Sequence, residues 1–188
     1  MKTVLAGILT LFVISTAMAT SASAQTVRWR QVVGVTTAQG VDNPICATDQ
    51  QGNCIGNIIH SGTFAWTTRS GGATVNLATG AASFHVEGLV INGTQFSGTA
   101  GPIAQVEGTL VCNLGGTMEA FLDTPPVNLS LQGDASFNGR LTGISGNCAN
   151  PLFLIRIVNP AGALGRWIAT GAGRTTTGPS SFFDGDEN

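Results

Sequence analysis

Apolar and polar residues alternate along most of this chain with the two-residue period of half-buried β-strands. The first clear case covers residues 27–35, where the pattern places Val27, Trp29, Val33 and Val35 on one face. No window keeps the i, i+3, i+4, i+7 spacing of an amphipathic helix, and glycine recurs too often for a long one. The pattern therefore predicts an all-β protein that opens with a strand.

Further segments of the same character follow, separated by turn-forming residues. The predicted strands after the first are 58–69, 73–77, 82–91, 103–112, 119–122, 127–131, 135–143, 152–158 and 166–171. Dipeptides such as Asn92-Gly93 and Pro125-Pro126 lie between them, and they supply positive φ or prevent continued pairing. The polar stretch 44–56 is expected to be a surface loop. Many short strands with regular turns are typical of a sandwich or a barrel.

Glycines also fall inside or beside the predicted strands, where each one marks a bulge, a corner or a close approach of two backbones. The glycines concerned are Gly88, Gly108, Gly133 and Gly143. Such positions favour a strongly curved sheet, and pairing of the first predicted strand with the last would close it. We therefore expect a single antiparallel β-barrel or strongly coiled β-sandwich of about 8–10 strands.

The N-terminus has the three parts of an export signal. Lys2 provides the positive charge, residues 5–13 the apolar segment, and Ala22-Ser23-Ala24 a small-residue cleavage site. The apolar segment is much shorter than the ~20 residues needed to span a bilayer, so no transmembrane anchor is expected. We predict a signal peptide over 1–24, a β domain over 25–174, a disordered tail over 175–188, and a secreted or periplasmic location.

The chain has four cysteines, all beyond the predicted signal: Cys46, Cys54, Cys112 and Cys148. Three pairings are possible, and export makes disulfides the expected state. We favour Cys46–Cys54, which closes a short loop, together with Cys112–Cys148. Because no CxxC pair occurs, no zinc site is expected, and no other metal site is predicted.

The charge content narrows the classes of partner. Only 10% of the residues are charged, against a usual ~25%, and the net charge is −2 without any cluster of Lys or Arg. Nucleic-acid binding depends on clustered cations, so no nucleic-acid partner is expected. No phosphate-binding loop is present, and no cofactor is predicted. A carbohydrate or a protein surface is the partner class that this composition leaves open.

Catalytic equipment is sparse, because the chain has only two histidines. His85 and Glu87 share a strand face, and a hairpin of 82–91 with 103–112 would bring Glu107 to that face. Two carboxylates ~5–10 Å apart are the minimum for glycoside hydrolysis. The alternative is a solvated outer face with Phe84 and Val86 turned inward.

His60 directly precedes Ser61, yet the chain has no Gly-x-Ser-x-Gly elbow. We expect His60 to be a loop or strand-edge residue.

Two residues are candidates for ligand binding. Trp29 and Trp66 share faces with apolar neighbours and are expected in the core, whereas Trp167 alternates with small residues and is the candidate exposed ring for stacking on a sugar. Its alternative role is packing over glycine. Arg156 lies in an apolar strand and is expected to be half-buried and paired, with Glu119 or Asp123, or to face a ligand in a barrel mouth.

These observations favour an exported, non-enzymatic β domain with a binding or structural role at a surface, in the periplasm or outside the cell. The first alternative is a barrel that binds a small ligand or a glycan, and the second is a secreted glycoside hydrolase. A deep apolar cavity with convergent polar groups would favour the ligand barrel. A filled core would favour an interaction role, and a cleft that joins His85 to Glu87 or Glu107 would favour the enzyme.

Overall fold

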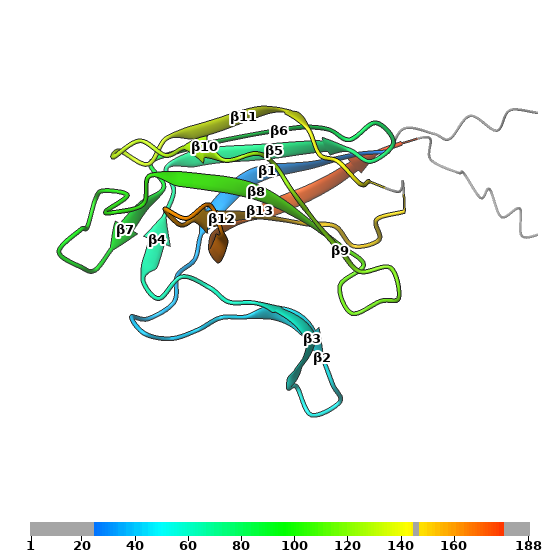
Figure 1. The fold of residues 1–188 in the computed structure, drawn as a ribbon, viewed down its shortest axis with the longest axis horizontal. Helices are drawn as coiled ribbons and strands as arrows, with labels where there is room; N and C mark the ends of the chain where they lie inside the picture. The colour runs from blue at the N-terminus through cyan, green and yellow to red at the C-terminus, as the bar shows by residue number, and fades with distance from the viewer. Residues whose placement is uncertain (1–24, 145–146, 179–188) are drawn as a thin grey trace, which may run out of the picture.

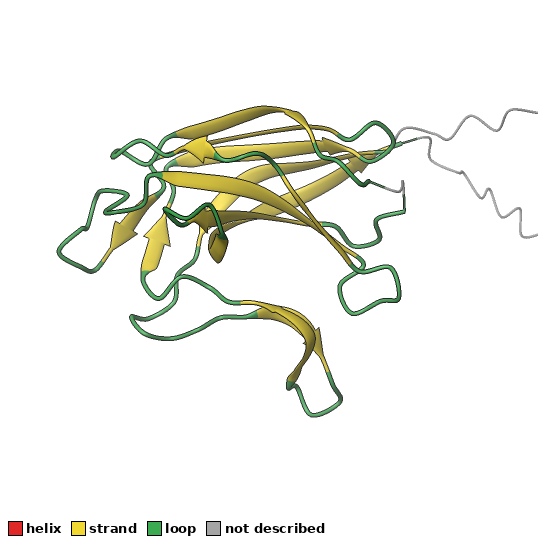
Figure 2. Ribbon diagram, viewed as in Figure 1, coloured by secondary structure: helices red, strands yellow, loops and turns green. Residues whose placement is uncertain are grey.

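The computed structural model describes residues 25–144 and 147–178. The regular secondary structure of these residues consists of β-strands (Figure 2). No helix in this part of the chain is long and apolar enough to cross a membrane. The predicted signal peptide, 1–24, and residues 179–188 of the predicted tail lie outside the described residues.

One curled antiparallel sheet of nine strands forms the body. Its order is β10 (Val127–Asn128), β8 (Gln105–Cys112), β12 (Leu152–Val158), β13 (Leu164–Thr177), β1 (Thr26–Gly34), β5 (Ser70–Asn76), β6 (Ala81–Glu87) and β11 (Ala135–Arg140), with β9 (Ala120–Asp123) paired to β8. The sheet folds over into a half-barrel, with β11, β6 and β5 along the top of Figure 1 and β8, β12 and β13 below them. The predicted strongly curved all-β fold is confirmed.

Two short ribbons complete the fold. β2 (Ile45–Thr48) pairs with β3 (Cys54–Ile59) in a hairpin that projects from the lower side of the body, and β4 (Ala65–Thr67) pairs with β7 (Val90–Asn92) at one end (Figure 1). The stretch 44–56, expected to be a loop, is therefore largely a hairpin. Its polar sequence hides this because most of the hairpin faces solvent.

Both predicted disulfides are confirmed. Cys46–Cys54 joins the two strands of the projecting hairpin, and Cys112–Cys148 ties the end of β8 to the segment before β12. No free cysteine remains among the described residues. Two disulfides indicate an oxidising compartment, extracellular or periplasmic, which is consistent with an exported protein.

The first and last strands pair along most of their length. β1 and β13 are antiparallel from Thr26↔Thr177 to Gly34↔Ala169. This confirms the predicted contact between the chain ends, although it lies in the middle of the half-barrel and does not close a barrel. Since β13 continues to Thr177, the folded part extends past the expected boundary at 174.

The expected hairpin of 82–91 with 103–112 is wrong. The chain leaves β6 at Gly88, which has a φ of 65°, and its next strand, β7, pairs with β4. β8 then enters the opposite layer beside β12, while β6 lies between β5 and β11. The predicted strand 58–69 is also divided, between the end of β3 and β4.

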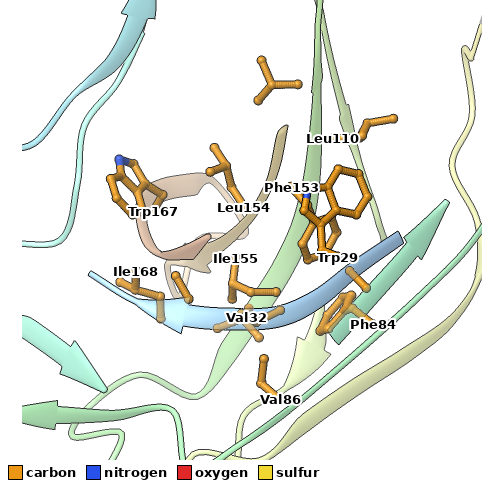
Figure 3. Packing of buried hydrophobic residues seen from close by; sticks show 14 of the residues in the cluster. Trp29, Val32, Phe84, Val86, Leu110, Phe153, Leu154, Ile155, Trp167 and Ile168 are labelled. Carbon is orange, nitrogen blue, oxygen red and sulfur yellow. The ribbon is translucent and has the colours of Figure 1, made fainter. Parts of the chain in front are cut away.

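Aromatic rings fill the space between the two layers (Figure 3). The ring centroid of Phe153 lies 5.5 Å from that of Trp29 and 5.7 Å from that of Phe84. Gly108 on β8 makes this possible, because a Cβ there would lie 2.8 Å from Phe153 Cζ and 3.0 Å from Phe84 Cδ1. The close approach predicted at Gly108 therefore exists, and the groups that approach the glycine backbone are the aromatic rings of Phe153 and Phe84.

The face assigned to Val33 is also wrong. Arg30 and Gln31 are both exposed, so the alternation shifts by one position in the middle of β1. Val32 is consequently buried and Val33 is 40% exposed.

Candidate functional site

The three residues of the hydrolase hypothesis do not form one site. His85 and Glu87 are exposed on the outer face of β6, while Phe84 and Val86 are buried. Glu107 lies on β8, which belongs to the other layer and pairs there with β12. The arrangement matches the alternative of a solvated outer face, and the paired carboxylates that glycoside hydrolysis requires are not brought together.

Glu87 has surface partners instead. It accepts hydrogen bonds from Ser70 Oγ at 2.9 Å and from Arg69 Nη2 at 3.3 Å. Both partners and Glu87 itself are exposed, so these contacts contribute little to stability.

Glu107 and Arg156 belong to a polar cluster on the outer side of β8 and β12. Glu107 is only 7% exposed, and burial together with the negative charge of Asp123 raises its pKa, against the opposing charge of Arg156. Burial lowers the pKa of Arg156, whose Nε donates to Gly165 O at 3.0 Å. Asp123 accepts from Thr109 Oγ1 at 2.6 Å.

This cluster agrees in part with the expected pairing of Arg156. The charge of Asp123 acts on Arg156, but Glu119 accepts a hydrogen bond from Asn57 Nδ2 at 3.1 Å in the contact between the hairpin and the body. Arg156 does not line the apolar pocket described below.

Trp167 is not an exposed ring. It is 5% exposed, and its Nε1 donates to Asn43 O at 3.1 Å. The chain after β3 runs beside it, with Trp167 N donating to His60 O at 3.0 Å and Gly62 N donating to Trp167 O at 2.7 Å. Segments 40–43 and 60–62 therefore hold a ring that the sequence pattern had suggested for sugar stacking.

A group of four side chains, which we call the Asp42 clasp, fixes these segments to β13. Asp42 contacts His60 Nδ1 and accepts from Ser61 N at 2.9 Å, and Arg166 Nη1 lies 3.6 Å from Asp42 Oδ1. Arg166 Nη1 also donates to Ser61 O at 2.7 Å. The hydrogen bond from His60, followed by that from the Ser61 backbone, holds the pKa of Asp42 below its ordinary value despite opposing desolvation.

The clasp contains Ser, His and Asp, but their hydrogen bonds are not arranged as in a catalytic triad. Ser61 is fully buried, and its Oγ accepts from Asn43 N at 2.8 Å and lies within hydrogen-bond distance of Asp42 and of Gly62 O. No hydrogen bond joins Ser61 Oγ to His60 within the described structure, so the imidazole has no path to the hydroxyl proton. The residue that organises this cluster, Asp42, has no local sequence signal.

An apolar pocket of about 220 Å³, which we call the end pocket, opens where the β4–β7 ribbon meets the ends of β12 and β13. Its walls come from the segment before β4, from both strands of the ribbon, from the connection between β7 and β8, and from β12 and β13. The lining residues are Gly62, Thr63, Phe64, Trp66, Ile91, Phe96, Pro102, Ile103, Ile157 and Arg166.

The end pocket differs in its chemistry from a wider groove that the described residues also form. This groove, of about 440 Å³, runs beside His85, Glu87, Asn128 and Asp134, but five of its eight lining residues have polar side chains. In the end pocket only Thr63 and Arg166 have side chains that end in strongly polar groups, while the rest are apolar or aromatic. Concave apolar surfaces with a few polar groups are the common form of small-molecule sites.

The described part of the chain contains no group of three His, Cys, Asp or Glu side chains that could hold a metal ion. Asp49, at the tip of the projecting hairpin, accepts from Asn53 N at 2.8 Å and from Gln51 N at 2.9 Å. These hydrogen bonds hold its pKa below the ordinary value and use the carboxylate to shape the turn.

Sequence reasoning missed most of the end pocket, although it had singled out Trp66 as a core residue. Phe96, Pro102 and Ile103 lie in a turn-rich segment, and Arg166 showed no pattern of its own. The available signal was Phe96, a large apolar residue in a turn-rich connection where no strand is predicted. No family model, curated protein or solved structure matches this chain, and the site is therefore interpreted from its own geometry.

Proposed function

We propose that this protein is an exported, non-enzymatic binding domain that holds a small apolar ligand in the end pocket. The observation that carries the proposal is the pocket itself: about 220 Å³ of space with walls that are almost entirely apolar. An apolar cavity of about 150 Å³ is enough to bind benzene. The end pocket is thus of the right size for one ring or a branched alkyl group.

The surrounding fold supports a preformed site. Ile157 and Arg166 lie on the long strands β12 and β13, and Trp66 and Ile91 face each other as a register pair of the β4–β7 ribbon. Side chains held on paired strands lose little freedom when a ligand binds, which favours affinity.

A binding role also agrees with the state of the candidate catalytic groups. His85 and Glu87 lie on another layer from Glu107, and Ser61 bonds to Asp42 rather than to His60. Of these groups, His85 and Glu87 face solvent and Ser61 forms structural hydrogen bonds, and this supports binding over catalysis.

The proposal can be tested by ligand-dependent stability of the disulfide-bonded protein with toluene, benzamide and benzoate as probes. A ligand at ten times its Kd stabilises the folded state by about 1.4 kcal/mol, or roughly 3–5 °C in Tm for a domain of this size. We expect such a shift for at least one probe.

Two variants locate the binding. Ile103→Phe introduces a larger side chain that fills the end pocket, and it should abolish the shift. Ile55→Phe, on the exposed face of the projecting hairpin, should keep the shift. Unfolding curves without ligand establish that both variants fold. An absent shift with all three probes, or an equal shift in Ile103→Phe, would show that the pocket is not a binding site.

A further inference from the structure

Trp66 places a hydrogen-bond donor, its indole Nε1, at the end pocket. The residue is 2% exposed and lines the pocket. This nitrogen lies beside Gly62, where a Cβ would be 3.2 Å from Trp66 Nε1, and both residues line the end pocket. Buried indole N–H groups usually find a partner, as Trp167 does with Asn43 O. An acceptor on a ligand in the end pocket can supply such a partner for Trp66 Nε1.

Arg166 places a second donor group at the same edge of the pocket. It is the one charged residue among the pocket's lining residues, and its side chain is 45% exposed. A guanidinium has five N–H donors, and Nη1 donates to Ser61 O at 2.7 Å. Because Trp66 Nε1 lies beside Gly62 and Arg166 holds the preceding Ser61, both donors lie against the same short segment of chain.

Asp42 only partly offsets the positive charge of Arg166. Its Oδ1 is 3.6 Å from Arg166 Nη1, but it also accepts from Ser61 N, and its Oδ2 contacts His60. Asp42 is not among the lining residues, and no other carboxylate is. The pocket therefore presents two nitrogen donor groups and no anionic acceptor.

We propose that the natural ligand is a compact carboxylate: a single ring or branched alkyl group carrying one carboxylate. This inference rests on the proposed function and deepens it. The apolar body lies among residues such as Phe64, Ile91 and Ile103, and the carboxylate accepts from Trp66 Nε1 and Arg166. A volume of about 220 Å³ takes such a molecule but is too small for a long-chain fatty acid.

The test compares four molecules of similar shape and different charge by calorimetric titration at pH 7: benzoate, benzamide, benzylamine and toluene. A hydrogen bond to a charged group contributes enough to change affinity by about 10-fold or more. We expect benzoate to bind at least 10-fold more tightly than benzamide and toluene, and benzylamine to bind most weakly.

Variants separate the contribution of each donor. Arg166→Gln should weaken benzoate by about 10-fold and leave toluene unchanged. Trp66→Phe keeps a ring but removes the N–H, and should weaken benzoate and benzamide together by a few-fold. Arg140→Gln removes an exposed arginine on β11, away from the pocket, and should change nothing.

The outcomes separate the two proposals. If benzamide or toluene binds as tightly as benzoate, or if Arg166→Gln leaves the preference intact, the carboxylate inference is wrong and the apolar binding function stands. If none of the four molecules binds, both are wrong. Should Trp66→Phe fail to fold, the benzoate preference in Arg166→Gln decides the inference alone.

Discussion

The middle of the half-barrel and its end pocket are built from the same kinds of residue and yet differ in whether they are filled. In the middle, Trp29, Phe84 and Phe153 interlock above Gly108. At the end, an equal number of aromatic side chains surrounds about 220 Å³ of space: Phe64, Trp66 and Phe96. The middle lies between long strands, whereas the end is walled largely by the three-residue strands β4 and β7 and by connections, beside the ends of β12 and β13.

The difference shows what turns an apolar cluster into a site. Rings fill a space when a facing position leaves room for them, as Gly108 does, and when paired strands fix the distance between layers. At the end, the β4–β7 ribbon and the connection after it hold the walls apart. Aromatic content alone therefore does not distinguish a core from a pocket, and three experiments can sharpen the distinction.

Truncating one ring in each region should give the largest contrast. Phe153→Ala leaves a cavity in the middle and should cost about 3–5 kcal/mol in the free energy of unfolding. Phe96→Ala removes a residue that is already 38% exposed and should cost about 1 kcal/mol or less. Urea unfolding of both variants measures this, and similar losses would mean that the end pocket is part of the structural core.

A methyl group at Gly108 should destabilise the protein by a smaller amount, through overpacking instead of through a cavity. Gly108→Ala forces Phe153 and Phe84 out of position, since the new Cβ would lie 2.8 Å from Phe153 Cζ, and overpacking of this sort costs about 1–3 kcal/mol.

Gly178→Ala serves as the control for Gly108→Ala, because a Cβ there has no neighbour closer than 3.8 Å, and it should be nearly neutral. Combining Gly108→Ala with Phe153→Leu should cost less than the sum of the two single changes. Strict additivity would contradict a shared packing site.

The Asp42 clasp supports the wall of the end pocket, and its loss should have the smallest effect on stability. Because the pKa of Asp42 is lower in the folded protein than its unfolded value of 3.8, ionised Asp42 stabilises the fold above about pH 4. This contribution disappears as the pH falls through the unfolded value toward the folded one. Asp42 is 36% exposed, so solvent screening keeps the contribution at about 1 kcal/mol or less.

Asp42→Asn should therefore be less stable than the parent at pH 7 and approach it near pH 3. Chemical unfolding of both proteins between these values measures the difference. The neighbours that carry or can carry charge here are His60 and Arg166, and Arg140→Gln provides a control for a change of surface charge. A difference that stays constant with pH would contradict the role given to the Asp42 carboxylate.

Much of the architecture could be predicted because it depends on local pattern. Period-two alternation predicted most of the sheet, and the spacing of Cys46 to Cys54 predicted the short-range disulfide that the structure contains. The prediction was wrong where the backbone departs from regularity: at Arg30–Gln31 the burial of β1 shifts by one residue, and at Gly88 the chain turns away from a hairpin. A side chain's face follows from alternation only while the strand stays regular.

The candidate sites were less predictable than the fold. His85, Glu87 and Glu107 follow a pattern that requires one particular strand pairing, and the real pairing puts β6 and β8 in different layers. The small neighbours of Trp167 make it a candidate exposed ring, with packing as the alternative, and the structure buries it under two distant segments.

The sequence by itself determined that this protein is all-β, curved and held by two disulfides, because alternation and turn residues act over short stretches of chain and four cysteines allow only three pairings. The tertiary structure alone decided where space remains. The end pocket gathers residues from 62 to 166, and a cavity depends on how distant segments fit against each other. The same reason explains why Asp42 and Arg166, without local signals, contribute to the wall and to the charge of the proposed site.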